Sequence, residues 1–178
     1  MSRRARRRPA SLWTRGVVAC VLVAVTAGAL SSCASGSDGA VEVHAPALQG
    51  ADAHTCRSFV DALPSKLYGQ ASRAVSPSSA PAAAWGDPAI VLTCGVGRPA
   101  DFTDTSTCVQ VDGVGWFVPD EVLLSSDGTK DVTFTAVGYR PRVQVLLPGT
   151  YRPEGFAAVT AVVGKLVGRR LDRVERCR

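Results

Sequence analysis

Apolar residues recur at helical spacing in two parts of the chain. In the first, within "DAHTCRSFVDAL", four of them fall at i, i+3, i+4 and i+7: Cys56, Phe59, Val60 and Leu63. This spacing places them on one face and predicts a short amphipathic helix. Asp52 is the candidate N-cap, and Pro64 ends the pattern.

The second helical pattern follows Pro153 and Glu154, which are favourable residues for a first turn. Its apolar face consists of six residues: Phe156, Val159, Val162, Val163, Leu166 and Val167. Interspersed glycines lower the helix propensity, yet the spacing is sustained over about three turns. We therefore predict a C-terminal helix.

Between the two helices the apolar spacing changes to that of strands. In "CVQVDGVGWFV", Asp112 and Gly113 separate alternating apolar residues, as a type I′ hairpin requires because both central residues adopt positive φ. Residues 89–94, "DVTFTAV" and "RVQVLL" are rich in β-branched residues and predict further strands. By contrast, "SPSSAPAAAWGDP" is rich in Pro, Ser and Ala, so we expect a loop there.

These elements predict an α+β fold, in which an antiparallel β-meander of about four to five strands is flanked by an N-terminal and a C-terminal helix. Both helices should pack on one face of the sheet. The folded part spans residues 51–178. That length is enough for one domain with its own core and too short for two.

The N-terminal residues have the pattern of an export signal. Arginines, with no acidic residue among them, precede an apolar run over residues 16–30, which is the order found in a signal peptide. The run is shorter than the roughly 20 residues that a membrane-spanning helix needs. We predict a signal peptide over residues 1–32. The Sec route is preferred, because the pair Arg3 and Arg4 lacks the apolar residues expected after a twin-arginine motif.

Two cleavage sites compete in this leader. Ala27-Gly28-Ala29 resembles the small-x-small site of ordinary secretion, whereas Leu30-Ser31-Ser32-Cys33 matches the lipobox of bacterial lipoproteins at every position. The fuller match favours a lipoprotein, in which Cys33 becomes the first residue and its sulfur carries a diacylglycerol. Residues 33–50 then form a flexible lipid-anchored tether. The protein would lie on the outer face of the cytoplasmic membrane.

Removal of the leader changes the charge of the protein. It takes six of the 20 Lys and Arg residues and none of the 15 Asp and Glu, which leaves a formal balance of about −1. Nucleic-acid binding is disfavoured, because no excess of positive charge remains to drive it. A basic cluster remains near the C-terminus: Lys165, Arg169, Arg170, Arg173, Arg176 and Arg178. Contact with lipid headgroups is one interpretation, and complementing a helix dipole is the preferred one.

Four cysteines remain in the exported chain: Cys56, Cys94, Cys108 and Cys177. In an oxidising compartment they predict two disulfides, for which three pairings exist. We expect Cys94 to pair with Cys108, because a short loop joins the strands that carry them. That leaves Cys56 with Cys177. A metal site is disfavoured, since C-x-x-C spacing is absent and His44 and His54 lie in or beside the tether.

Several segments carry a resemblance to a known family: "ALP", "AAAWGDPAIVLTCGV", "VDGVGWFV" after Cys108, and "YRPRVQVLLP". They resemble uncharacterised lipoproteins of high-GC Gram-positive bacteria, over essentially the whole exported domain. The most specific part runs from Trp85-Gly86-Asp87-Pro88 to Cys94-Gly95. The resemblance implies a location outside the cytoplasmic membrane, and it transfers no catalytic residue.

The residues themselves give little support for catalysis. A Ser/His/Asp triad would have to use His54, for which a solvated or capping role is the preferred interpretation. Cysteines in disulfides cannot act as nucleophiles. The acidic residues of the predicted turns suit local backbone hydrogen bonds: Asp101, Asp104, Asp112, Asp120, Asp127 and Asp131. A glycosidase carboxylate pair or a weak calcium site stays open without a supporting motif. We expect no enzymatic activity, no cofactor and no metal.

Binding is the better-supported role. The candidate binding residues lie at predicted loop and strand ends: Trp85, Asp87, Trp116, Tyr139, Arg140 and Arg142. Most belong to the types enriched at binding hot spots. For Trp85 and Trp116, a place in the core is the preferred alternative, and Arg140 could serve only a surface ion pair. A pocket lined by the three aromatic residues, with Arg140 at its mouth, would indicate ligand binding, and a flat aromatic patch a protein partner.

These observations predict a membrane-anchored, non-catalytic binding module of the cell envelope. Its partner would be another envelope protein. The alternatives are a binder of a small molecule or cell-wall fragment and, third, a cell-wall hydrolase.

Overall fold

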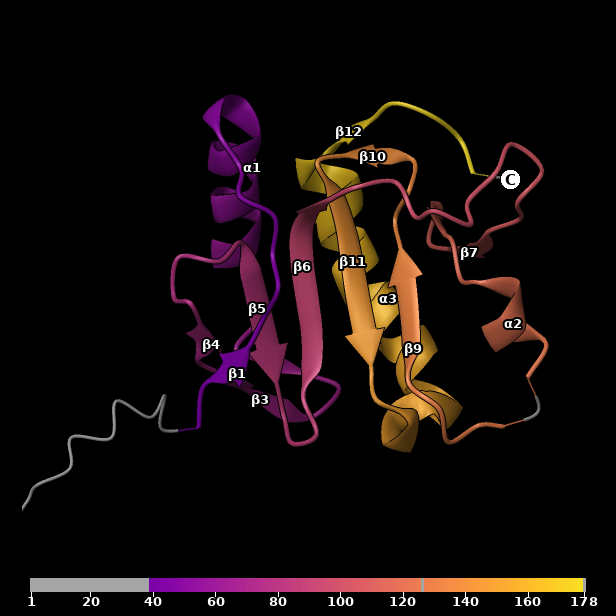
Figure 1. Ribbon diagram of the computed structural model, residues 1–178, viewed down its shortest axis with the longest axis horizontal. Coiled ribbons are helices and arrows are strands. Elements are labelled where there is room, and N and C mark those ends of the chain that lie inside the picture. The colour runs from indigo at the N-terminus through magenta and orange to yellow at the C-terminus, as the bar shows by residue number, and fades with distance from the viewer. Residues whose placement is uncertain (1–38, 126, 178) are drawn as a thin grey trace, which may run out of the picture. The chain divides into compact units, whose positions relative to one another are not determined.

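A six-stranded antiparallel sheet organises the computed structural model, which describes residues 39–125 and 127–177 (Figure 1). In spatial order its strands are β2 (Lys66–Leu67), β3 (Gln70–Arg73), β5 (Ala82–Trp85), β6 (Ile90–Val96), β11 (Arg142–Leu147) and β9 (Val132–Thr135). The predicted signal peptide of residues 1–32, the lipobox and its Cys33 lie outside the described residues. Among the described helices, none has the length and apolar character needed to cross a membrane.

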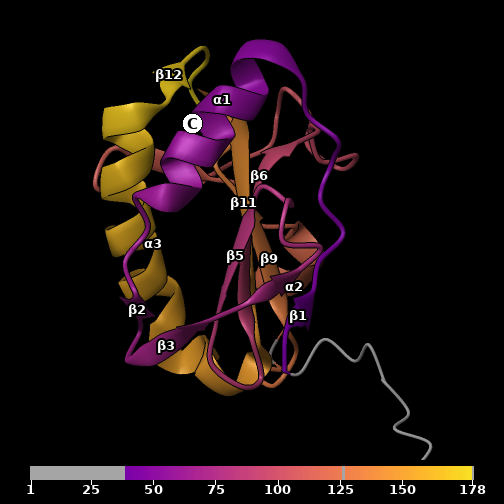
Figure 2. The same ribbon diagram turned by 90° about the vertical axis from the view of Figure 1, so that its left-hand side faces the viewer.

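Two helices cover one face of this sheet, α1 (Gly50–Asp61) and α3 (Arg152–Arg170) (Figure 2). Alternate residues of β6 and β11 point toward them and are fully buried: Ile90, Leu92, Cys94, Val143, Val145 and Leu147. The helices contribute matching apolar residues, among them Phe59 from α1 and Val163 from α3. This alternation places the hydrophobic core between the sheet and the helices.

Shorter elements surround the sheet. They are the parallel pair β1 (Val41–Glu42) and β4 (Val75–Ser76), the hairpin β7 (Val109–Val111) and β8 (Val114–Trp116), the pair β10 (Tyr139–Arg140) and β12 (Asp172–Arg173), the helix α2 (Asp120–Leu123) and a 3₁₀ turn at Gly149–Tyr151. The segment with β1 lies on the sheet face opposite α1 and α3 (Figure 2).

The predicted α+β class is confirmed: an antiparallel sheet lies in the chain between an N-terminal and a C-terminal helix, and both helices pack on one face of it. The hairpin turn is confirmed as well, because Asp112 and Gly113 have φ of 48° and 80°. The strand order follows a meander from β2 to β6. Beyond β6, however, β11 lies between β6 and β9, and the hairpin forms a separate small sheet.

Two local predictions were wrong. Gln49 rather than Asp52 occupies the N-cap position, since α1 begins at Gly50. The segment predicted as a loop contains β5, although Ala is a weak strand former. Pairing with β6 along its whole length holds β5 in the sheet, so tertiary contacts override the local preference.

The predicted disulfide pairing was also wrong. Cys56 of α1 pairs with Cys94 of β6, and Cys108 pairs with Cys177. Because α1 packs directly on β6, Cys56 faces Cys94 across the core, and both are fully buried. The C-terminal segment returns past the β7–β8 hairpin, which brings Cys177 to Cys108. Two disulfides indicate an oxidising, extracytoplasmic compartment.

Residues 41–48, which the prediction placed in the tether, belong to the folded domain. Val41 and Glu42 pair with β4, and the side chain of Val43 is buried. Farther along, Leu48 packs against Gly95. The folded domain therefore extends N-terminal of residue 51, where the prediction placed its start.

Candidate functional site

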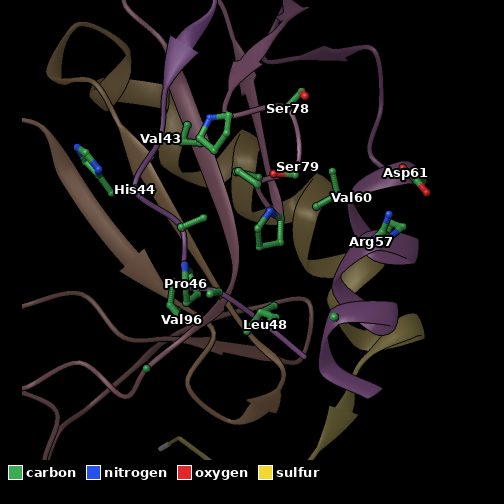
Figure 3. A pocket seen from close by; sticks show the side chains of 18 residues that line it. Val43, His44, Pro46, Leu48, Arg57, Val60, Asp61, Ser78, Ser79 and Val96 are labelled. Carbon is green, nitrogen blue, oxygen red and sulfur yellow. The ribbon is translucent and has the colours of Figure 1, made fainter. Parts of the chain in front are cut away.

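A groove of about 1040 Å³ lies at one side of the sheet (Figure 3). Its walls are residues 43–48, one side of α1, and residues 77–82, which lead into β5. The end of β6 closes the hollow at Val96 and Gly97. We call this hollow the groove. Its volume is at the upper end of the range of pockets that bind small molecules.

The groove opens where the segments that follow the paired strands β1 and β4 separate. The backbone N–H of Val43 donates to the carbonyl of Ser76 at 2.9 Å, and this is the last hydrogen bond of the β1–β4 pair among the described residues. The pairing of β4 with β1 ends at Ser76, and Pro77 follows it. Residues 43–48 then lead away to the end of β6, where Leu48 packs against Gly95. Val43 and Leu48 thus fix the two ends of this wall.

The edge of β5 is open beside the groove. β3 pairs only with Ala84 and Trp85, at the far end of β5. Ala82 and Ala83 pair with β6 on one side, and on the other side no strand within the described part of the chain pairs with them. Ala82 itself lines the groove. The N–H of Ala82 donates to the carbonyl of Ala80 at 2.8 Å, so this short open edge offers a partner an acceptor rather than a free donor.

The extended wall also has unpaired backbone groups. Within residues 39–125 and 127–177, the N–H groups of His44, Ala45, Ala47 and Leu48 donate no backbone hydrogen bond. Buried or half-buried backbone groups are normally paired, with protein or with water. His44 and Ala47 are exposed and Ala45 and Leu48 are half-buried, so these N–H groups are open to water or to the main chain of a partner.

Charged groups lie at one side of the groove only. Arg57 and Asp61 stand one turn apart on α1, and Ser78 and Ser79 lie on the facing loop (Figure 3). Both charged side chains are exposed, and neither takes part in an ion pair among the described residues. His44 points away from the hollow in the same view. The groove thus combines apolar walls with one guanidinium, one carboxylate and two hydroxyl groups.

The predicted aromatic pocket does not form. Trp85, Trp116 and Tyr139 are at most 4% exposed and belong to the core, which confirms the alternative interpretation of the two tryptophans. The indole N–H of Trp85 donates to the carbonyl of Pro64 at 2.9 Å, and Trp116 packs edge-on against Phe134. Large rings carry much of the buried area of a small domain, and these rings stabilise the fold.

The predicted polar residues are also dispersed. Arg142 is only 3% exposed, and its guanidinium donates to the carbonyl of Val137 at 3.2 Å and to Glu175 at 3.5 Å. Burial, and then the nearby charge of Arg140, lower the pKa of Arg142. Arg140 and Asp87 are exposed on separate elements, with Asp87 3.7 Å from Arg73. These residues do not converge on one site.

Two smaller hollows remain. One, of about 350 Å³, lies beside the C-terminal segment, where the guanidinium of Arg173 donates to the Tyr139 hydroxyl at 2.7 Å. The other, of about 320 Å³, is lined by His54, Arg57 and Arg170 between α1 and α3. Within the described chain, no group of three or more His, Cys, Asp or Glu side chains is placed to hold a metal ion.

Sequence reasoning missed the groove. Its lining is mostly Ala, Pro and Val, and the only cue in the sequence was the run "SPSSAPAAAWGDP", which was interpreted as a loop. The groove depends on four segments that meet only in the folded domain, so no local spacing marks it.

Comparison with known proteins gives one result. No curated protein and no solved structure matches the chain. One family model does match, over residues 14–171, and it covers α1, the whole six-stranded sheet, the groove and all of α3. The chain therefore belongs to the family described as a protein of unknown function, DUF3515.

Proposed function

We propose that this protein is a non-catalytic binding module of the cell envelope, and that the groove is its binding site. A lipid on Cys33 holds it on the outer face of the cytoplasmic membrane. Its partner is another envelope protein, which it meets while both are confined to the membrane surface. Confinement raises the effective concentration of the partner without any further contact.

The observation that carries this proposal is the construction of the groove. Its walls are fixed by the β1–β4 pair, by the contact of Leu48 with Gly95 and by the Cys56–Cys94 disulfide, which holds α1 on the sheet. The core does not need the hollow, and yet rigid elements keep it open. Preformed concave sites of this kind are typical of binding proteins.

The beginning of the domain supports the membrane anchor. The guanidinium of Arg73 donates to the carbonyl of Gly39 at 2.6 Å and to that of Gly86 at 3.0 Å. Gly39 lies six positions after Cys33. An extended chain of that length reaches about 20 Å. A lipid on Cys33 would therefore keep the domain close to the bilayer.

A cell-wall fragment or small molecule is the second candidate ligand, and the volume of the groove favours it. About 1040 Å³ is enough to enclose a ligand larger than a typical drug. In that case the module would present or retain a wall component near the membrane.

The test is capture from cross-linked membrane fractions with a groove-filling variant. Ala53 lines the groove on α1, and Ala53→Trp would occupy it, whereas Ala157→Trp places the same ring on an exposed position of α3. We expect Ala53→Trp to lose the captured partner and Ala157→Trp to retain it. Retention by both variants, with unchanged melting temperatures, would refute the groove as the binding site.

The anchor is tested separately. The intact mass of the membrane-extracted protein should include a diacylglycerol on Cys33, and Cys33→Ala should appear in the soluble fraction. An unmodified Cys33 in the mature protein would contradict a lipoprotein.

A further inference from the structure

We propose that the occupant of the groove is an extended peptide of small apolar side chains that ends in a free carboxylate, bound by strand addition. This inference rests on the proposed function, because it takes the groove as the binding site. It adds the chemical class of the ligand and the residue that meets its charged end, which is Arg57.

The backbone of the groove calls for an extended chain. Four N–H groups of the wall, from His44, Ala45, Ala47 and Leu48, donate no backbone hydrogen bond among the described residues, and because alternate N–H groups of an extended chain point to opposite sides, only a subset of them can face one ligand. Beside this wall, the first half of β5 has a strand neighbour on only one side. A peptide in extended conformation carries alternating donors and acceptors that complement such an edge. Main-chain bonds would then supply much of the affinity.

The walls select the size of the side chains. Five alanines line the groove, at positions 45, 47, 53, 80 and 82, together with three prolines, at positions 46, 77 and 81. Grooves that recognise polyproline helices are lined by aromatic residues. No Phe, Tyr or Trp is among the described residues that line this one. Shallow apolar walls of this kind favour residues such as Ala, Val and Ser on the ligand.

The charges favour an anionic end at α1. Arg57 lines both the groove and the small hollow that it shares with His54 and Arg170. The guanidinium of Arg57 has no carboxylate within ion-pair distance among the described residues. Asp61 is the one acidic residue of the groove lining, and it disfavours a second negative charge. A single carboxylate fits, because a guanidinium can hold it with two hydrogen bonds.

The probe is a synthetic library of random hexapeptides, each with an acetylated N-terminus and a free C-terminal carboxylate. The full-length protein, purified in detergent, is used for affinity selection, and the selected peptides are identified by mass spectrometry. We expect enrichment of small apolar residues. A selected peptide should bind about tenfold more weakly when its C-terminus is amidated or when Arg57 is changed to Ala, as expected for loss of one charge-assisted contact.

Strand addition has a readout of its own. N-methylation of alternate backbone amides of the peptide removes hydrogen-bond donors without changing its side chains. Methylation of the amides on the face that meets the groove should abolish binding. Arg169→Ala is the matched control for Arg57→Ala, because Arg169 is exposed on α3 and lines none of the three hollows described. Its affinity for the peptide should be unchanged.

Equal binding of the amidated and free peptides, or of Arg57→Ala and Arg169→Ala, would overturn the carboxylate site. Indifference to N-methylation would overturn strand addition. If the library gives no binder while Ala53→Trp still abolishes capture of the partner, the peptide inference fails and the proposed function stands. If Ala53→Trp leaves capture intact, the proposed function itself fails.

Discussion

The side chain of Leu48 packs on the backbone of Gly95 so closely that a β-carbon at position 95 would overlap its terminal methyl groups. Gly95 is the unpaired residue of a bulge, since Arg142 lies opposite Val96 and Val143 lies opposite Cys94. Its φ of +86° is one that residues with a side chain rarely adopt. This contact fixes one end of the groove wall to the sheet.

Gly95→Ala should therefore destabilise the protein. The added methyl group must displace Leu48, and the backbone at φ +86° becomes strained. We expect a loss of about 1–3 kcal/mol in the free energy of unfolding, measured by urea denaturation. Gly97→Ala is the control, because its β-carbon would meet nothing within 4 Å and its φ is not positive. Similar stabilities of the two variants would contradict this description of the contact.

The two disulfides should differ in their reactivity. Cys56 and Cys94 are fully buried, whereas Cys108 and Cys177 are partly exposed. Thiol–disulfide exchange requires access of the attacking thiolate to a sulfur atom. Increasing concentrations of dithiothreitol, followed by alkylation and peptide mapping, should open Cys108–Cys177 first. Earlier or simultaneous alkylation of Cys56 would contradict the prediction.

Glu175 should stabilise the fold through Arg142. Their side chains are 3.5 Å apart, and Arg142 is almost fully buried while Glu175 is about one-third exposed. Glu175→Gln removes the charge that compensates the buried guanidinium. After allowance for solvent screening, we expect a loss of about 1–2 kcal/mol in thermal or urea unfolding. Glu42→Gln, at an exposed position without an ion pair among the described residues, should have no measurable effect.

Asp127 should contribute to stability only above acidic pH. Its carboxylate accepts hydrogen bonds from the hydroxyl and the backbone N–H of Thr129, and these lower the pKa of Asp127. Because the pKa is lower in the folded state, the contribution is complete above the unfolded value near 4 and is lost as the pH falls through the folded value. An NMR titration of the Asp127 carboxyl carbon should give a midpoint below that of an unfolded Asp. A midpoint at or above the value for an unfolded Asp would refute this.

Local signals predicted the elements that depend on local interactions. The Asp112–Gly113 turn follows from positive φ at both positions, and α3 follows from an apolar face repeated over many residues. In contrast, β5 has alanines at three of its four positions, and only its pairing with β6 makes it a strand. Its position in the sheet therefore could not be derived from its own residues.

The disulfides and the site depend on tertiary packing. Four cysteines allow three pairings, and the choice was decided by the packing of α1 on β6, which no spacing in the sequence reveals. For the site, sequence reasoning chose Trp85, Trp116 and Tyr139 by residue type, and the core uses all three. The groove is lined mainly by Ala, Pro and Val, and their spacing in the sequence marks no site.

Hydrogen exchange of the groove amides tests the central claim most directly. In the purified protein, the amides of Ala45, Ala47 and Leu48 should exchange rapidly, since they donate no backbone hydrogen bond among the described residues. In the complex with the captured partner, the account predicts strong protection within this group of amides and no change at Gly128, which does not line the groove. A complex that forms without slowing exchange at Ala45, Ala47 and Leu48 would contradict the groove as the binding site.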